Sequence, residues 1–160
     1  MFVKKDDEQE IRLVSTEQAN LLWISSWCSL ASSIYAFRLR HYKLGSGALI
    51  VYATSLLYWR NPTHSWRRVL DMFCVHATFF YHLYKVAPTS YMKTYYSRAF
   101  IIVMLYPCSL YLHRKRLSWW SVYAHALLHV LGNGINIQMY QALHRIERRS
   151  VSFCEKMNHG

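Results

Sequence analysis

The chain has 160 residues, enough for one domain, and only 17% of them are charged, below the roughly 25% typical of soluble domains. Hydrophobic residues make up 53%, and the formal net charge is +11. The basic residues gather in short connectors between apolar runs, as expected beside anionic lipid headgroups, so nucleic-acid binding is not expected. Four cysteines, three of them inside apolar runs, indicate no disulfide framework.

The first 16 residues form a polar head without hydrophobic periodicity. At its end, "STEQ" (15–18) matches a helix N-terminal capping box, in which Ser15 or Thr16 accepts from free backbone N–H groups. We therefore expect a polar head at 1–16, a transmembrane helical domain at 17–143 and a basic tail at 144–160.

Five charge-poor runs follow the head, and a membrane-spanning helix needs about 20 mostly apolar residues. The class we predict is an all-α, polytopic transmembrane bundle of about five spans, an integral multi-pass membrane protein. A soluble all-α bundle is the alternative, but its helices would need polar outer faces that these runs lack. The approximate spans are 18–37, 44–59, 68–87, 95–113 and 118–140, the second being short for a full crossing.

Pro107 lies inside the fourth predicted span. Because proline has no backbone N–H and its ring collides with the preceding turn, we expect a kink between Val103 and Pro107.

The last span carries a polar stripe on one helical face, at about 100° per residue. Its members include His125, His129, Asn133 and Asn136. Segregation of this kind predicts that the stripe avoids lipid. One interpretation is helix–helix packing with hydrogen bonds across the interface; the other is a functional site.

Asp71 near the start of the third span is the second unusual residue, because an ionisable group inside a membrane is costly and often functional. Pairing with Arg67, one helical turn earlier, is the simpler explanation. Measured from the interfacial tryptophans, Ser55, Asp71 and His125 lie at similar depths. Convergence of the three side chains in one layer is therefore expected.

A serine, an aspartate and two imidazoles one turn apart form a set suited to catalytic Zn²⁺. In this hypothesis Ser55 and Asp71 are the catalytic residues and His125 and His129 bind the metal. His76, expected level with His129, is the candidate third ligand.

The same pattern, with "HALLHVLGN" (125–133) in the last span, resembles the CREST superfamily of membrane hydrolases, which includes alkaline ceramidases and adiponectin receptors. The resemblance implies zinc-dependent hydrolysis of a lipid amide by seven-helix membrane proteins. In that family a third His stands four residues after the Ser, and here that position is Trp59. His64 or His76 would have to replace it, or the site is a degenerate version.

Three other functions remain open. The chain can be a non-catalytic membrane scaffold or complex subunit whose polar stripe packs helices, with other membrane subunits as partners. It can be a small proton-coupled transporter that uses Asp71, His125 and His129 as a relay. It can also hold a haem between His76 and His129.

The connector between the second and third spans is rich in Arg and Trp. Trp59 and Trp66 suit the membrane interface, and Arg60, Arg67 and Arg68 are candidate contacts to a lipid phosphate. Membrane lipids are therefore the expected partners.

Overall fold

The computed structural model describes residues 12–158, and all regular structure within them is helical. Most of the predicted head, residues 1–11, lies outside the described residues. The helices are α1 (Thr16–Ser25), α2 (Trp27–Arg38), α3 (Tyr42–Trp59), α4 (Trp66–Val86), α5 (Met92–Val103), α6 (Leu105–Arg114) and α7 (Ser118–Asn158).

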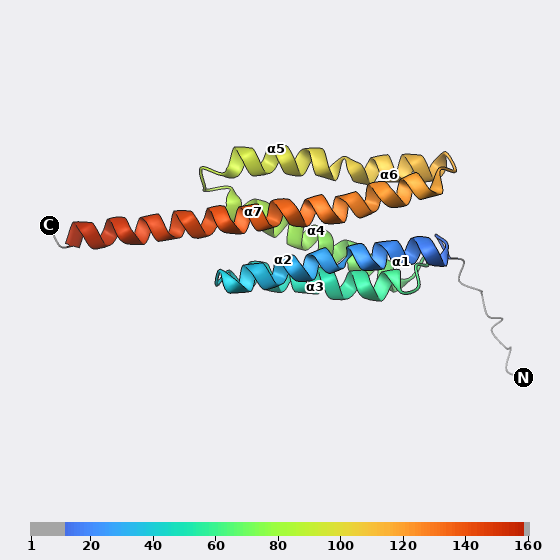
Figure 1. Cartoon of the computed structure of the whole chain (residues 1–160), viewed down its shortest axis with the longest axis horizontal. Coiled ribbons are helices and arrows are strands. Elements are labelled where there is room, and N and C mark those ends of the chain that lie inside the picture. The colour runs from blue at the N-terminus through green and yellow to red at the C-terminus, as the bar shows by residue number, and fades with distance from the viewer. Residues whose placement is uncertain (1–11, 159–160) are drawn as a thin grey trace, which may run out of the picture.

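In this part of the chain the helices form five rods, because α1 and α2 meet end to end, as do α5 and α6 (Figure 1). The α1–α2 junction is Ser26. Ser25 and Ser26 both donate their hydroxyls to the Leu22 carbonyl oxygen at 2.9 Å, and such back-bonding bends helices. The capping box at the start of α1 is confirmed, with Ser15 as the cap and Gln18 as its reciprocal partner.

The junction between α5 and α6 falls at Met104, inside the predicted interval from Val103 to Pro107. Pro107 cannot donate to the carbonyl of Val103, so one bond of the helical ladder is missing at this point. The helix is therefore interrupted within the interval where the sequence predicts a kink.

The last helix, α7, is the centre of the fold and packs against α1, α2, α5 and α6. In Figure 1 the α5–α6 rod lies on one side of α7, the α1–α2 rod and α3 lie on the other, and α4 lies behind. The C-terminal part of α7 projects past the other helices (Figure 1). The predicted boundary between residues 143 and 144 falls inside this continuous helix.

Two glycines of α3 allow close packing on both of its sides. A Cβ at Gly45 would lie 3.0 Å from the Phe37 ring of α2, and one at Gly47 would lie 3.1 Å from Thr78 Cγ2 of α4. Polar contacts accompany this approach: Ser33 Oγ donates to the Gly45 carbonyl oxygen at 2.8 Å. The hairpin of α2 and α3 and its contact with α4 therefore depend on small side chains.

Within residues 12–158, no helix combines the length and the apolar character that crossing a membrane requires.

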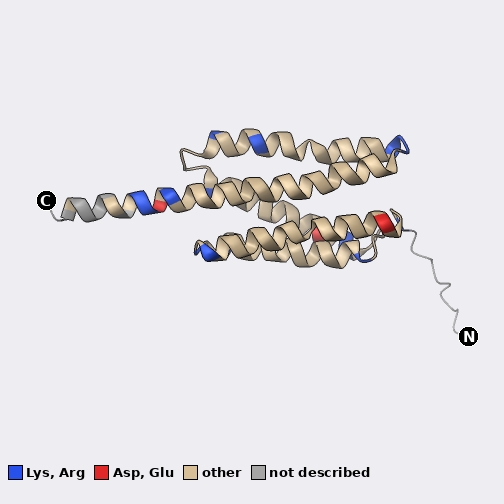
Figure 2. Ribbon diagram, in the orientation of Figure 1, with Lys and Arg blue, Asp and Glu red and all other residues tan. Residues whose placement is uncertain are grey.

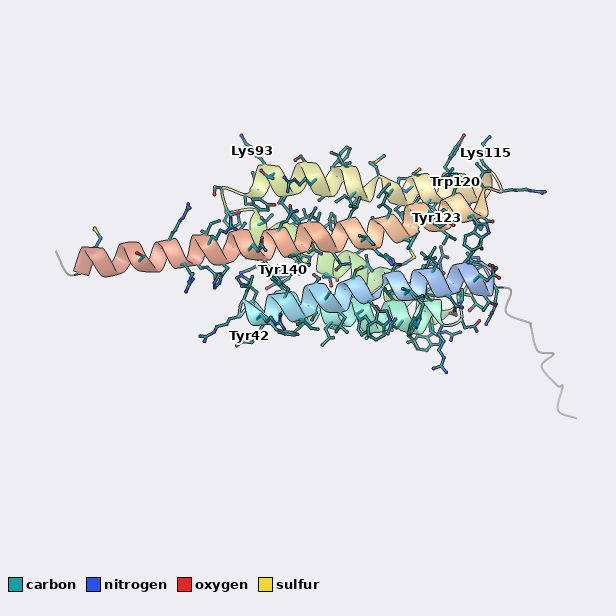
Figure 3. The ribbon with its side chains drawn as sticks, viewed as in Figure 1. Tyr42, Lys93, Lys115, Trp120, Tyr123 and Tyr140 are labelled. Carbon is teal, nitrogen blue, oxygen red and sulfur yellow. The ribbon has the colours of Figure 1, made fainter. Side chains whose placement is uncertain are left out.

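Polar and apolar side chains are distributed unusually between interior and surface. Serines of α2 are buried: Ser32 and Ser33 are 0% exposed and Ser29 is 6% exposed. Large apolar side chains of α4 point outward, with Val69 at 69% and Phe73 at 70% exposure. Lys and Arg are concentrated at the helix ends, the connections and the projecting part of α7 (Figure 2), and Lys93 and Lys115 point away from opposite ends of the α5–α6 rod (Figure 3).

Candidate functional site

Asp71 lies in the second turn of α4, faces α3 and is only 8% exposed. Its Oδ1 accepts hydrogen bonds from Ser55 Oγ at 2.7 Å and from Thr54 Oγ1 at 2.9 Å. A carboxylate that accepts two hydroxyl bonds has part of its lost hydration replaced. The predicted approach of Ser55 to Asp71 is therefore confirmed, and pairing of Asp71 with Arg67 stays a prediction.

Thr54 is the member of this cluster that the sequence interpretation missed. It precedes Ser55 in α3, and both side chains reach the same carboxylate oxygen. In the sequence, nothing distinguishes a threonine within an apolar run from residues that only pack. Thr54 is recognised as part of the cluster only because α4 places Asp71 beside it.

The predicted histidine pair lies on α7, with ring centroids 4.9 Å apart. Both side chains are partly buried. His129 Nδ1 is hydrogen-bonded to Ser25 Oγ of α1 at 2.8 Å. His125 packs edge-on against the rings of Tyr106 in α6 at 6.1 Å and Trp59 in α3 at 5.3 Å.

The rest of the α7 stripe is bonded to neighbouring helices. Asn133 Nδ2 donates to Ser29 Oγ at 3.1 Å, and Tyr95 OH donates to Asn136 Oδ1 at 2.8 Å. The prediction that this stripe faces protein is confirmed, because its polar groups find partners on α2 and α5.

Trp59 connects the carboxylate cluster with the histidine pair. It follows Ser55 by one turn of α3, is 8% exposed, and packs on His125. Its indole Nε1–H is buried and has no hydrogen-bond partner among the described residues. An unpaired buried donor costs about 1–3 kcal/mol, so the indole of Trp59 is energetically unfavourable at this position in one respect, its unpaired N–H.

The residues present do not complete the zinc site that the resemblance implies. His125 and His129 offer two imidazoles, but the third position holds an indole, whose nitrogen can only donate a proton. His76 does not join them: it is exposed on α4, and its Nδ1 lies 2.6 Å from the Met72 carbonyl oxygen. His64 is exposed as well, with Nδ1 at 3.2 Å from Arg68 Nη1.

A different set of ligand atoms does cluster. Among the described residues, His41, His144 and Glu147 are the group of three whose potential ligand atoms all lie within 4.8 Å of one another. Sequence interpretation missed this group, because His41 is separated from the other two by about a hundred residues.

The predicted phosphate contacts lie at the ends of α3 and α4. Arg60 is exposed at the C-cap of α3, and Arg67 and Arg68 are partly buried in the first turn of α4. Contact with a lipid phosphate stays a prediction.

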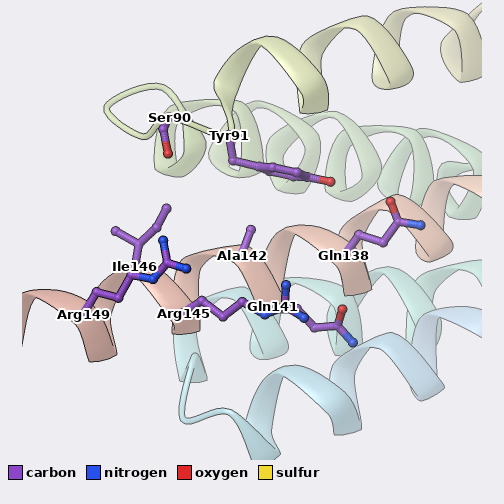
Figure 4. Close-up of a pocket in the computed structure, with 8 residues that line it drawn as sticks. All are labelled: Ser90, Tyr91, Gln138, Gln141, Ala142, Arg145, Ile146 and Arg149. Carbon is purple, nitrogen blue, oxygen red and sulfur yellow. The ribbon is translucent and has the colours of Figure 1, made fainter.

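An open cavity of about 400 Å³ lies elsewhere, between the α4–α5 connection and α7 (Figure 4). Ser90 and Tyr91 lie on one side of it, and Arg145 and Arg149 of α7 lie on the other. None of the predicted catalytic or metal-binding residues lines this cavity.

Comparison with protein-family models, with curated proteins and with solved structures gave no match to this chain. The resemblance to the CREST superfamily therefore rests on the residues quoted above and stays a prediction.

Proposed function

We propose that the chain is a multi-pass integral membrane protein whose helical bundle carries a degenerate form of a lipid-hydrolase site. In this proposal the polar residues hold the bundle together as a non-catalytic membrane scaffold or complex subunit. The observation that carries the proposal is Trp59, which packs on His125 at the position where the resembled family has its third imidazole.

Placement in a membrane is supported by the surface of the bundle. Outward-facing side chains of α4 and α5 are large and apolar, among them Phe73, Phe80, Phe100 and Ile101, each more than 60% exposed. Side-chain hydroxyls and amides instead form hydrogen bonds between helices, as they do where a bilayer rather than water surrounds the helices. The cationic connectors would then lie in the headgroup layer.

A scaffold role is supported by the way the candidate catalytic groups are engaged. Asp71 accepts from two hydroxyls of α3, and His129 is hydrogen-bonded to Ser25 of α1. The Asp71 bonds join the consecutive helices α3 and α4, and the His129 bond joins α7 to α1, 104 residues away. The same groups that would perform chemistry in an enzyme therefore fix the relative positions of α1, α3, α4 and α7.

The test is to restore the missing imidazole. If Trp59 stands where a zinc ligand stood, the Trp59→His variant gains about one zinc per chain relative to the wild type, measured by elemental analysis of detergent-purified protein. The gain disappears when His125→Ala is added. Trp27→His, which places an imidazole at a half-exposed tryptophan of α2, is the matched control and gains none.

Two results would overturn the proposal. One is a wild-type chain that already holds zinc which is lost on His125→Ala or His129→Ala, since the site would then be intact. The other is a folded Trp59→His variant with no additional zinc, since the match of Trp59 to the family's ligand position would then be wrong.

The second candidate is a zinc-dependent hydrolase acting on a membrane lipid amide. It is favoured by the 4.9 Å separation of the His125 and His129 rings and by the 2.7 Å bond from Ser55 to Asp71. Its test is release of fatty acid from an N-acylated sphingoid lipid in mixed micelles. Activity that is lost in Ser55→Ala and in Asp71→Asn would establish the enzyme and exclude the scaffold role.

A further inference from the structure

The turn between α2 and α3 lies against α7, just before the C-terminal part of α7 that projects past the other helices. Arg40 in this turn adopts φ 63°, a left-handed conformation that is strained for a residue with a side chain. His41, the next residue, is the N-cap of α3, and its side chain is only 8% exposed. The turn therefore directs a histidine inward, against α7.

The hydrogen bonding of His41 defines which of its nitrogens is free. Its Nε2 lies 3.2 Å from the backbone carbonyl oxygen of Tyr140. A carbonyl oxygen can only accept, so Nε2 carries the proton, and Nδ1 of the neutral ring keeps its lone pair. Donation from the distal nitrogen to a carbonyl is the usual way in which a protein orients a metal-binding histidine.

The free nitrogen faces two further ligands on α7. His41 Nδ1 lies 3.9 Å from Glu147 Oε1, and the His41 and His144 rings stand 6.2 Å apart at 86°. His144 and Glu147 are three residues apart, so they share one face of α7. The potential ligand atoms of all three residues lie within 4.8 Å of one another.

We infer that His41, His144 and Glu147 form a site for a divalent transition-metal ion, with zinc as the expected occupant. Two imidazoles and one carboxylate match a common zinc ligand set, and the imidazoles disfavour Ca²⁺ and Mg²⁺. In a tetrahedral site with bonds of about 2.1 Å, ligand atoms stand about 3.4 Å apart. Glu147 is 65% exposed on its side chain and free to make this approach.

The exposure of Glu147 also leaves a fourth position open to water. A bound ion would fasten the α2–α3 turn to α7, joining segments about a hundred residues apart. The inference is independent of the proposed function, because it involves neither Trp59 nor the pair His125 and His129.

The test uses the full chain, purified in detergent with a reducing agent and titrated with zinc chloride after chelator treatment. We expect about one zinc per chain, an increase in thermal midpoint that EDTA reverses, and the visible absorption of tetrahedral Co²⁺ on cobalt substitution. Glu147→Gln should weaken zinc binding by at least tenfold, with an unchanged circular dichroism spectrum, because Glu147 is exposed. His144→Ala should do the same.

The matched controls are His64→Ala and His113→Ala, which remove exposed histidines outside the group and should leave the affinity unchanged. His125→Ala should also leave it unchanged, which separates this site from the one considered above. The inference is overturned if the chain binds no zinc, or if the binding survives in the Glu147→Gln/His144→Ala double variant.

Discussion

The indole ring of Trp59 and the imidazole ring of His125 meet edge to face, with centroids 5.3 Å apart and planes at 72°. Such ring pairs contribute about 0.5–1.5 kcal/mol beyond the burial of their area. The ring contact joins α3 to α7 without a hydrogen bond from the indole, since the Trp59 Nε1–H has no partner among the described residues. The contact made by Trp59 is therefore apolar packing, although Trp59 lies between the polar cluster around Asp71 and the histidine pair of α7.

The first prediction concerns the buried carboxylate of Asp71. Asp71→Leu should destabilise the bundle by about 1–3 kcal/mol, because the Ser55 hydroxyl loses its acceptor, whereas the Thr54 hydroxyl keeps the Val51 carbonyl oxygen at 3.2 Å. The free energy of unfolding in detergent, followed by circular dichroism, is the measurement.

The matched variant for Asp71 removes the donors as well. In Thr54→Val/Ser55→Ala/Asp71→Leu no polar group is left unpaired, so most of the lost stability should return. If this triple variant is less stable than Asp71→Leu alone, the hydroxyl–carboxylate bonds are not the source of the effect.

The second prediction concerns the close approach of α3 and α4 at Gly47. Gly47→Val should reduce stability by about 1–3 kcal/mol, because added carbons collide with Thr78 and force the helices apart. The control is Gly134→Ala in α7, where a Cβ would meet nothing within 4 Å. There we expect no loss, or a gain of up to about 1 kcal/mol from helix propensity. Equal effects of the two substitutions on the thermal midpoint would contradict the packing argument.

The third prediction tests the membrane placement through Cys108, which is exposed on α6. In membranes opened by freeze–thaw, a membrane-impermeant maleimide should leave Cys108 unlabelled until SDS is added, because lipid covers this face. The chain should carry Cys154→Ser, and the labelled residue is identified by mass spectrometry.

A cysteine at a connector supplies the comparison for this labelling. Lys115→Cys, in the turn between α6 and α7, should react at once under the same conditions. Labelling of Cys108 as fast as position 115 would mean that water reaches the apolar surface and would refute the membrane proposal.

The five rods could be predicted because charged connectors separate the apolar runs. The second run, 44–59, corresponds to α3 at Tyr42–Trp59, and the third, 68–87, to α4 at Trp66–Val86. The interruption near Pro107 followed from the missing N–H of proline. The interruption at Ser26 could not be predicted, because many serines occur in helices without bending them.

The last predicted span, 118–140, is shorter than α7, because the prediction follows the apolar run and the helix continues beyond it. Residues 144–149, "HRIERR", are polar, but Arg and Glu are good helix formers and continue the helix to Asn158. Hydropathy predicted the apolar part of the helix and not its end.

The sequence predicts only part of the candidate site, and the reason is geometric. Spacing along one helix identifies residues that share a face, so the stripe containing His125 and His129 was found. Partners on other helices depend on how the rods rotate and pack, which single-helix spacing does not determine. Thr54, Ser25 and His41 were therefore missed, and His76 was grouped with residues from which its exposed position on α4 separates it.

The central position of α7 also sets the order in which the bundle can be completed during synthesis. Ser25, Ser29 and Tyr95 each have a hydrogen-bond partner on α7, which is synthesised after the helices that carry them. Until residues 118–136 are made, these three hydrogen bonds to α7 cannot form. The close packing of α3 with α2 and α4 does not involve α7, whereas α5 and α6 pack mainly against it, so truncation before α7 should yield a chain that quality control degrades rather than a smaller stable bundle.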